Sequence, residues 1–246
     1  MEIIVPAAGL STRFPEMKPK YLLYDYKGDL MIRNAIRPYM DDYTIHIGIL
    51  KEHNELYNAE EVLKYELGNS VKIYILDNPT KGPADTVYQA IMKSEYFFSS
   101  ISPMLIKDCD GFYDSELIGG NTIYVSRLSK NPDIRNAPAK SYTITNEQGI
   151  ITSVVEKQIV SDSFCVGGYQ FSSIGEYVDI FERLKDSATS EIFVSNIIDY
   201  MISNGRLFNE KEVENFIDIC LSLENLIDPQ ASFRAKSKNL SQEEKE

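Results

Sequence analysis

Small residues and basic side chains lie close together within the first twenty residues of the chain. The apolar residues 3–5 predict a buried parallel strand, and the small residues after it, up to Gly9, allow a loop backbone to approach a ligand closely. Arg13 and Lys20 follow in the same stretch, where their positive charges could meet phosphate oxygens. The opening therefore predicts phosphate chemistry, although an ordinary strand-to-helix turn has a similar composition.

Two carboxylates, those of Asp108 and Asp110, follow the apolar residues 104–106. A strand over these residues would carry both to its carboxyl end, where their hard oxygen ligands could hold Mg²⁺ against the oxygens of a triphosphate. The spacing also matches the D-x-D pattern of glycosyltransferases, and paired aspartates occur in ordinary strand-end turns. A metal site, a glycosyltransferase motif and a simple turn all remain open at this point.

A tight turn and the start of a helix are predicted at Gly82 and Pro83, directly after an apolar segment that ends near Asp77. The amino terminus of that helix would offer backbone N–H groups to a ligand. Asp85, in its first turn, could accept a hydrogen bond from the exocyclic amine of a base, or it could simply cap the helix.

Strands and helices must alternate in the first half of the chain to position these groups. The predicted strands cover residues 2–8, 43–50, 71–77 and 103–108, and the predicted helices lie near 30–41, 52–67 and 84–97. Because the strands are almost continuously apolar, we expect an α/β fold with a parallel sheet covered by helices on both faces. Ligands bind such sheets beyond the carboxyl ends of the strands, where the basic and acidic residues lie.

The second half has a different pattern, in which extended segments are followed by helices. The extended segments are predicted near residues 121–128, 139–147, 150–156 and 164–171, and the helices near 173–186 and 190–204. The turn residues Asn146 and Gly149 predict a hairpin between the second and third of these segments. We expect a single domain over residues 1–228, closed by a helix after Leu223, and a polar tail over residues 229–246.

The composition argues against several classes of protein. The chain has 246 residues, a formal net charge of −12 and a pI near 4.8, whereas a groove that follows nucleic-acid phosphates needs an excess of basic residues. Its three cysteines lie far apart without C-x-x-C spacing, so neither a disulfide framework nor a zinc site is predicted. No apolar run approaches the ~20 residues that span a bilayer, and we expect a cytoplasmic protein without a membrane anchor.

The opening motif resembles the signature of the sugar-phosphate nucleotidyltransferases, the pyrophosphorylase family. That signature reads roughly as an apolar strand, A-G/A-G-x-G-T-R, a short gap and then P-K. Gly9, Thr12, Arg13 and Lys20 match it, whereas Ser11 stands where the family usually has a second glycine. The resemblance implies a Rossmann-like α/β fold with a mostly parallel central sheet, and a first loop that binds the nucleoside triphosphate.

Two further motifs resemble the family's metal site. The family has one metal-binding aspartate at the end of its middle strand, and the D-G-F sequence favours Asp110 for this position, with Asp108 a close second. Asp218 matches the second metal aspartate of a late W-x-D-x-G-T segment, although Cys220 stands in place of its glycine. The resemblance therefore implies a site for Mg²⁺.

Three other motifs resemble the segments that seat the base and the acceptor. Gly82 and Ala84 match a G-x-A segment beside the nucleotide base. Glu156 and Lys157 match a strand that ends in E-K-P, whose lysine contacts the acceptor phosphate in the family, but the next residue is glutamine instead of proline. Gly168 matches the glycine of a V-x-G-x-Y-x-F strand, against whose backbone the acceptor lies. The motifs run in the family's order over nearly the whole chain.

The resemblance also implies a reaction and a role for each residue. In the family, the acceptor phosphate attacks the α-phosphorus of a nucleoside triphosphate in line, and pyrophosphate leaves. Arg13, Lys20 and Lys157 would be the catalytic residues. The nucleotide site would comprise Ala7, Ala8, Gly9, Leu10, Ser11, Thr12, Arg13, Lys20, Gly82, Pro83, Ala84 and Asp85, the acceptor site Glu156, Lys157 and Gly168, and the metal site Asp110, Asp218 and Asp108.

The P-A-A-G opening is more similar to pyrimidine-using members, especially cytidylyltransferases, than to thymidylyl or guanylyl enzymes. We therefore expect CTP, with UTP next, and a small phosphorylated acceptor such as phosphocholine or another phosphorylated amine or amide, used in capsule or surface-polysaccharide synthesis. The alternatives are a thymidylyl- or uridylyltransferase acting on a sugar 1-phosphate, a D-x-D glycosyltransferase, and a non-catalytic nucleotide-binding regulator. No nucleic-acid or membrane partner is expected, and the oligomeric state stays open.

Overall fold

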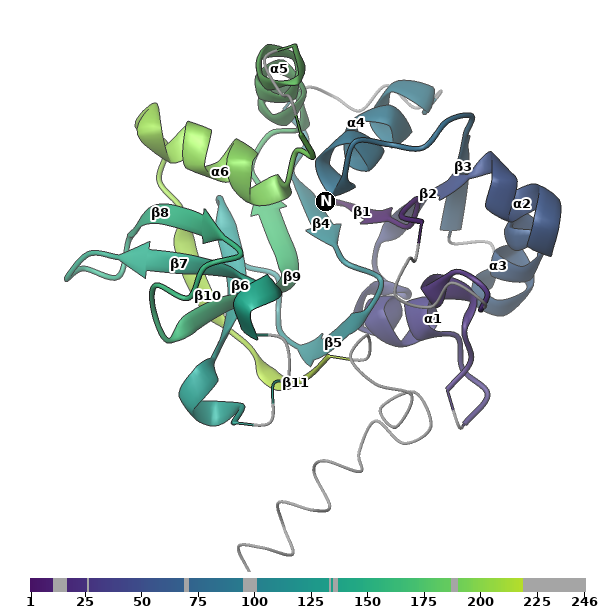
Figure 1. Ribbon diagram of the computed structural model, residues 1–246, viewed down its shortest axis with the longest axis horizontal. Helices are drawn as coiled ribbons and strands as arrows, with labels where there is room; N and C mark the ends of the chain where they lie inside the picture. The colour runs from purple at the N-terminus through teal and green to yellow at the C-terminus, as the bar shows by residue number, and fades with distance from the viewer. Residues whose placement is uncertain are drawn as a thin grey trace, which may run out of the picture.

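The structure of the chain is a computed structural model that describes residues 1–10, 17–25, 27–68, 71–94, 101–132, 134, 137–186 and 190–218. The main path of its central sheet contains β1 (Glu2–Pro6), β2 (Thr44–Leu50), β3 (Val71–Leu76), β4 (Met104–Lys107), β6 (Thr122–Arg127), β9 (Ser163–Phe171) and β10 (Asn209–Glu212). Across the sheet the order is β10, β6, β9, β4, β1, β2 and β3 (Figure 1).

Neighbouring strands from the first half of the chain run parallel. Ile3 of β1 lies opposite Ile45 of β2 on one side and opposite Leu105 of β4 on the other. The exception is β9, which runs antiparallel between β4 and β6. The prediction of a mostly parallel sheet is confirmed, and β1, β3 and β4 direct their carboxyl ends to the same edge of the sheet.

Helices cover both faces of this sheet, as predicted. They are α1 (Met31–Ile36), α2 (Lys51–Tyr57), α3 (Ala59–Leu67), α4 (Pro83–Lys93), α5 (Ile174–Lys185) and α6 (Val194–Ser203), with short 3₁₀ helices at Lys20–Leu22, Arg37–Tyr39, Leu128–Lys130 and Ala137–Ala139. Figure 1 shows α4, α5 and α6 on one side of the sheet and α1 with α3 on the other.

The alternation of side chains along β1 divides the core between these two helix layers. Ile3 and Val5 are fully buried and pack on the side of α1 and α3, whereas Ile4 packs on the side of α4. Burying an aliphatic side chain of this size contributes about 1.5–3 kcal/mol. A strand covered on both faces must be apolar at successive positions, which explains why its sequence pattern is continuous rather than alternating.

The helix predicted over residues 52–67 is two helices, α2 and α3, which meet at Asn58. This residue has a left-handed backbone conformation, with φ 50° and ψ 43°. The side-chain oxygen of Asn54 accepts a hydrogen bond from the N–H of Glu60 at 2.9 Å and so satisfies a donor at the start of α3. Asparagine tolerates this conformation better than most residues, but the apolar pattern does not reveal a single left-handed residue.

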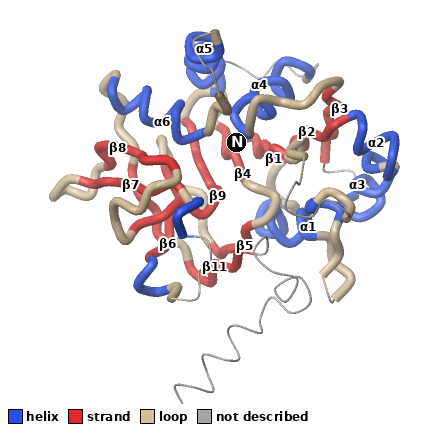
Figure 2. Tube along the Cα trace, viewed as in Figure 1, coloured by secondary structure: helices blue, strands red, loops and turns tan. Residues whose placement is uncertain are grey.

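The second half contains the predicted hairpin and several short strands that were not predicted. The hairpin pairs β7 (Ser141–Thr145) with β8 (Ile151–Glu156). A separate two-stranded sheet pairs β5 (Gly111–Asp114) with β11 (Glu214–Asp218). Strands of this length are too short to show a clear alternation. Figure 2 shows that strands crowd this half of the molecule, while helices surround the outer strands of the first half.

Two expectations fall beyond residue 218, outside the residues that the structure describes. They are the closing helix after Leu223 and the polar tail over residues 229–246. The single domain over residues 1–228 therefore stays a prediction.

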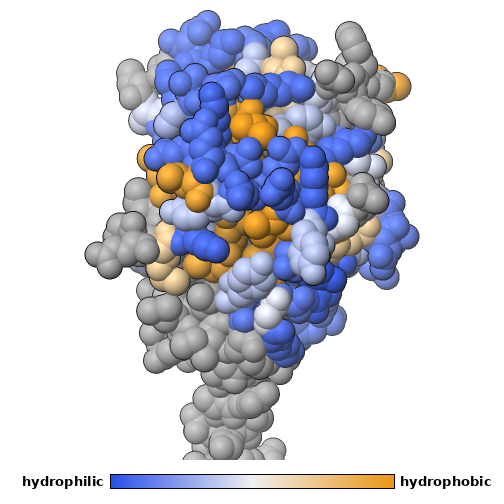
Figure 3. All heavy atoms as spheres, turned by 90° about the vertical axis from the view of Figure 1, so that its right-hand side faces the viewer, coloured by the Kyte–Doolittle hydropathy of each residue, from blue (hydrophilic) through white to orange (hydrophobic). Residues whose placement is uncertain are grey.

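Apolar side chains are scattered over the surface of α2 and α3. Leu56 and Tyr65 are 64% and 88% exposed. Figure 3, which shows the side of the molecule that carries α2, α3 and β3, has small separate hydrophobic areas within a mainly hydrophilic surface. Scattered apolar residues of this kind are ordinary on a protein surface. Within the described part of the chain, every helix is too short or too polar to cross a membrane.

Candidate active site

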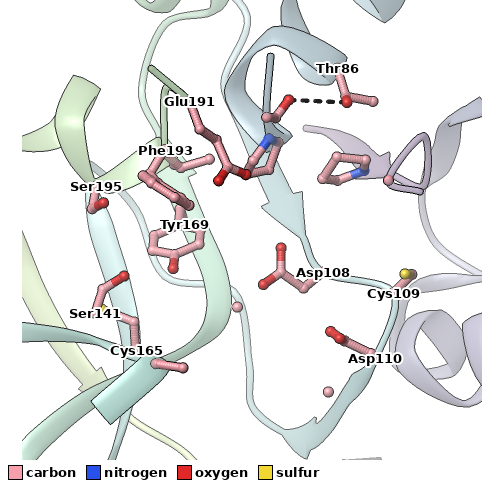
Figure 4. Close-up of a pocket in the computed structure, with 18 of the residues that line it drawn as sticks. Thr86, Asp108, Cys109, Asp110, Ser141, Cys165, Tyr169, Glu191, Phe193 and Ser195 are labelled. Atoms are coloured by element: carbon pink, nitrogen blue, oxygen red, sulfur yellow. Dashed lines mark hydrogen bonds between the residues drawn. The ribbon is translucent and has the colours of Figure 1, made fainter. Parts of the chain in front are cut away.

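A cleft of about 870 Å³ opens at the carboxyl ends of β1, β3, β4 and β8 (Figure 4). The predicted site residues that line it are Ala7, Ala8, Gly9, Leu10, Lys20, Gly82, Pro83, Asp108, Asp110, Glu156, Lys157 and Asp218. The lining does not include Ala84, Asp85 or Gly168, and Ser11, Thr12 and Arg13 lie outside the described residues. Folding therefore brings residues from motifs far apart in the sequence to one cavity.

The loop after β1 begins as a buried extension of the strand. The N–H of Ala7 donates to the carbonyl of Gly48 at 2.9 Å, and the side chains of Ala7 and Ala8 are buried. Gly9 and Leu10 line the open part of the cleft, and a Cβ atom at Gly9 would meet no neighbour within 4 Å. The described structure leaves space for a ligand beside this loop.

Two lysine–aspartate ion pairs lie on the floor of the cleft. The ammonium group of Lys20, in the short helix Lys20–Leu22, donates to Oδ2 of Asp110 at 2.5 Å. The ammonium group of Lys140 donates to Oδ2 of Asp218. Because β11 pairs with β5 so that Asp218 lies opposite Gly111, Asp218 is next to Asp110 in the register. The two residues predicted to bind metal therefore lie at neighbouring register positions, and each carboxylate has a lysine partner.

Asp108 lies in the middle of the cleft, against β9 (Figure 4). Its N–H donates to the carbonyl of Gly167 at 2.8 Å. Gly167 has φ +76°, and a Cβ atom on it would lie 2.5 Å from Oδ2 of Asp108, so a larger residue would displace the carboxylate. Gly168 faces the buried ring of Tyr113 instead. The structure thus places Gly167, rather than Gly168, in the lining.

A buried lysine supports the acidic turn that follows β4. Lys107 is fully buried, and its ammonium group donates to the carbonyls of Asp108 and Gly111 at 2.9 and 2.5 Å. Burial lowers the pKa of Lys107 to about 8. Burial, together with the charge of Asp110, raises the pKa of the Asp108 carboxyl, and nearby lysines partly oppose this shift. The turn therefore combines crowded carboxylates with cations that offset their charge.

The aspartate in the first turn of α4 holds the preceding turn in place. Gly82 has φ +117°, and Ala84 is fully buried in the first turn of α4. One carboxylate oxygen of Asp85 accepts the N–H of Lys81 at 2.7 Å, and the other accepts the side-chain amide of Gln89 at 3.0 Å. Lys81 precedes both the N-cap residue Gly82 and the helix, so Asp85 closes the turn and makes no N-cap hydrogen bond.

Glu156 is held by two hydroxyl groups on the opposite side of the cleft from the first loop. Its Oε2 atom accepts hydrogen bonds from Oγ of Ser141 at 2.5 Å and from Oγ of Ser195 at 2.6 Å. Both serines line the cleft and are labelled in Figure 4. The hydroxyl groups fix one carboxylate oxygen, so that Glu156 presents a defined acceptor to a ligand.

Lys157 reaches the loop that precedes α6. It has a left-handed φ of 55°, and its ammonium nitrogen lies 4.1 Å from the centroid of the Phe193 ring and 3.9 Å from Oε2 of Glu191. Half of the Lys157 side chain remains exposed. A flexible ammonium group at the mouth of a cleft can move to meet an incoming anion.

Comparison with known proteins shows which enzymes the chain resembles in sequence and in fold. No family model matches the chain. The bifunctional protein GlmU of Aquifex aeolicus is 28% identical over 243 residues, which cover 86% of this chain and 49% of GlmU. The nucleoside-diphosphate-sugar pyrophosphorylase of Vibrio cholerae has a TM-score of 0.75 at 16% identity, over 94% of this chain and 98% of that one. The chain is thus similar in sequence and in fold to sugar-phosphate nucleotidyltransferases.

A second nucleotidyltransferase structure has the same fold. The inositol-1-phosphate CTP transferase of T. maritima gives a TM-score of 0.66 at 18% identity, with 91% of this chain and 92% of that one covered. The Rossmann-like fold expected from the sequence is therefore confirmed. The chain spans about half the length of GlmU.

The paired aspartates of this nucleotidyltransferase fold suit a magnesium ion. Mg²⁺ is usually bound by one or two carboxylates and completes its shell with water and substrate phosphate oxygens. Asp110 and Asp218 provide two carboxylates in neighbouring register positions that line the same cleft. In the described part of the chain, no three His, Cys, Asp or Glu side chains are grouped closely enough to hold a metal ion by themselves.

Lys140, Glu191 and Phe193 are among the residues that line the cleft and that sequence reasoning missed. No motif marks Lys140, whose partner is known only once β11 is placed. The helix predicted from residue 190 begins at Val194, which leaves Glu191 and Phe193 in a loop. The side-chain oxygen of Asn196 accepts the N–H of Phe193 at 2.8 Å, and this helix-start signal could have moved the predicted boundary.

Proposed function

We propose that the chain is a nucleotidyltransferase that transfers a nucleotidyl group from a pyrimidine nucleoside triphosphate, with CTP favoured, to a small phosphorylated acceptor and releases pyrophosphate. The observation that carries this proposal is the single cleft in which the first loop, the two lysine-paired aspartates and the Glu156–Lys157 strand end meet. The similarity of the chain to nucleotidyltransferases in sequence and fold supports the reaction class.

The reaction is a displacement at phosphorus. An oxygen of the acceptor phosphate forms a bond to the α-phosphorus, while the bond from the α-phosphorus to the bridging oxygen breaks and pyrophosphate leaves with that electron pair. No covalent intermediate with the protein is needed. Positioning of the two phosphates and neutralisation of their charge supply most of the acceleration.

Each charged residue has a place in this scheme. Arg13 holds the triphosphate and stabilises the departing pyrophosphate, and Lys20 neutralises charge beside the reacting phosphates. Lys157 orients the acceptor phosphate from the mouth of the cleft. Asp110 and Asp218 hold Mg²⁺, which neutralises phosphate charge when bound. Asp108, in the middle of the cleft, is the second choice for a metal ligand.

The preference for a pyrimidine base rests on the small residues of one cleft wall. Ala7, Ala8, Gly82 and Pro83 all line the cleft and leave backbone groups to pair with the edge of a base. A site built on such hydrogen bonds rejects a mismatched base strongly. The T. maritima relative, named a CTP transferase, supports this choice. Asp85 is not part of this wall, because its carboxylate accepts the N–H of Lys81 and it lies outside the cleft lining.

A substrate screen tests the proposal. CTP, UTP, ATP, GTP and dTTP are combined with a panel of phosphorylated acceptors, including phosphocholine and sugar 1-phosphates, and pyrophosphate release is measured. We expect release that depends on the acceptor, with the highest kcat/KM for CTP. A purine preference would refute the base assignment alone. Cleavage of nucleotide sugars without pyrophosphate, or binding without turnover, would refute the reaction class.

We further propose that the reaction takes place in the cytoplasm and supplies capsule or surface-polysaccharide synthesis. The product class supports this, because a nucleotide-activated group is ready for transfer to a growing polymer. Deletion of the gene followed by analysis of the surface polysaccharide tests the role. Loss of a phosphate-linked substituent is the expected result, and an unchanged polymer would contradict it.

A further inference from the structure

Lys140 and Lys157 face each other as a backbone pair at the open end of the β7–β8 hairpin. The N–H of Lys157 donates to the carbonyl of Lys140 at 3.0 Å, which continues the register in which Ser141 faces Glu156. Both lysines line the cleft. The ammonium group of Lys140 points to Asp218, and that of Lys157 to the Glu191 carboxylate. Two cations thus border the acceptor half of the cleft from neighbouring positions.

The pair formed by Lys140 and Asp218 is less exposed to solvent than the pair formed by Lys157. The side chains of Lys140 and Asp218 are 23% and 9% exposed, whereas those of Lys157 and Glu191 are 52% and 49% exposed. The Lys140 ammonium nitrogen also lies 5.8 Å from the centroid of the Phe216 ring. A partly buried lysine needs an anionic partner close by, and Asp218 is that partner in the ligand-free protein.

The assignment of Asp218 as a metal ligand changes the surroundings of Lys140. If Asp218 is shared with a divalent cation, its carboxylate no longer fully neutralises Lys140. The metal ion and the Lys140 ammonium group, both beside Asp218, then repel each other unless another anion lies between them. A phosphate group bound to a metal ion that Asp110 and Asp218 would hold meets this requirement. Lysine suits the task, because its compact charge on a flexible stem can turn from the carboxylate to a phosphate oxygen.

We propose that Lys140 is a further substrate-binding residue, which together with Lys157 holds the phosphate of the acceptor beside Asp110 and Asp218. This inference rests on the proposed function. In the ligand-free protein, the ion pair with Asp218 keeps Lys140 in place at low cost. When the acceptor is bound, its phosphate replaces Asp218 as the partner of Lys140. Lys140 therefore contacts the acceptor phosphate on the side of the cleft that carries Asp110 and Asp218.

Inorganic phosphate is the probe that tests this site. The protein is saturated with Mg²⁺ and the α,β-methylene analogue of CTP, which fills the nucleotide site without reacting, and phosphate binding is then measured by calorimetry. We compare the parent protein with Lys140→Met, Lys140→Arg and the control Lys130→Met. Lys130 also pairs with a glutamate, Glu212, but it lies outside the cleft lining and is 67% exposed.

We expect Lys140→Met to weaken phosphate binding at least ~10-fold, because a hydrogen bond to a charged group contributes about that factor or more. The phosphate affinity of Lys140→Arg should stay within ~3-fold of that of the parent, and the affinity of Lys130→Met should equal that of the parent. Phosphate affinity that is unchanged in Lys140→Met, or absent in the parent, would overturn the assignment. A parent protein that neither binds the analogue nor releases pyrophosphate from CTP would instead refute the proposed function.

The melting temperature of the ligand-free protein separates substrate binding from a purely structural role. Lys140→Met should lower it, because the partly buried Asp218 carboxylate loses its partner. The double variant Lys140→Met with Asp218→Asn should recover the melting temperature but not the affinity for phosphate. Recovery of both by the double variant would show that Lys140 acts only through Asp218, and would overturn the proposal.

Discussion

Gly82 and Glu191 are in contact across the mouth of the cleft. A Cβ atom on Gly82 would lie 2.6 Å from Cγ of Glu191 and 2.8 Å from the carbonyl oxygen of Ile192. The N–H of Ile192 donates to the carbonyl of Lys81 at 2.9 Å. The turn before α4 and the loop before α6 are therefore joined, and this contact links the nucleotide half of the cleft to the acceptor half.

Replacing Gly82 by alanine should destabilise the protein and disturb the cleft. Its backbone, with φ +117° and ψ 177°, lies in a region that is almost exclusive to glycine and costs other residues about 1–3 kcal/mol. The contact with Glu191 adds strain. Gly205→Ala is the control, because Gly205 also has a positive φ, +83°, but a Cβ atom there meets no neighbour within 4 Å. Urea unfolding should show a larger loss for Gly82→Ala, and equal losses would contradict the contact.

Asp110→Asn should reduce turnover by at least ~10²-fold, since removing one such electrostatic element costs about 2.7–4 kcal/mol at the transition state. The substitution also weakens the ion pair with Lys20. Asp108→Asn should have a smaller effect. Asp77→Asn is the control, because Asp77 follows β3 and pairs with the exposed Lys93 outside the cleft lining. Rates at saturating Mg²⁺ decide the order, and a larger effect at Asp108 would exchange the two roles.

Arg13 and Lys157 should differ in the substrate that they affect. Arg13→Ala should lower kcat/KM for the nucleoside triphosphate, whereas Lys157→Ala should mainly raise the KM for the phosphorylated acceptor. Steady-state kinetics with each substrate varied in turn separate the two effects. Acceptor kinetics that are unaltered in Lys157→Ala would rule out its place in the acceptor site.

Stability should fall as the pH drops below about 6.5, partly because of His46. Both ring nitrogens of this buried side chain are hydrogen bonded, to the Tyr74 hydroxyl and to Glu2, each at 2.8 Å. Burial lowers the pKa of His46, Glu2 partly opposes this, and Lys72 lowers it further. The unfolded chain therefore binds a proton near pH 6.5, where the folded protein does not, and stability is lost as the pH falls towards the folded pKa.

Urea unfolding of the parent and of His46→Gln at pH 7.5 and 5.5 measures this effect. The difference in unfolding free energy between the two pH values should be smaller in the variant, by at most about 1.4 kcal/mol per pH unit. His53, the second histidine, also has a pKa lowered by burial, so some pH dependence should persist. The same slope in both proteins would show that His46 makes no contribution.

The sequence predicts the buried central strands but not the pairing of short strands that lie far apart in the chain. The apolar runs at β1 and β4 are buried on both faces, so their pattern alone locates them. Strand β5 follows the acidic turn and pairs with β11, about a hundred residues later, and neither has a periodic pattern. The partnership of Lys140 with Asp218 depends on that pairing and therefore has no local signal.

The structure differs from the predicted roles of Gly168 and Asp85, because contacts with neighbouring backbone atoms, and not the residue type, determine where these residues lie. Gly167 and Gly168 are identical in sequence terms, and only the pairing of β9 with β4 shows that Gly167 meets Asp108. Asp85 could read a base or cap a helix, but its carboxylate accepts the N–H of Lys81, a residue that precedes the helix. Twelve of the predicted site residues line one cavity, but the direction of each side chain needed the folded structure.

The pairing of β5 with β11 also sets the order in which the cleft can form during synthesis. Asp110 leaves the ribosome early, but its neighbour in the register, Asp218, is added about a hundred residues later. A nascent chain that stops before residue 214 can fold most of the sheet and still lack one carboxylate and the partner of Lys140. Asp110 and Asp218 come together only when β11, the last described strand, has been synthesised, so incomplete chains lack one of the two carboxylates.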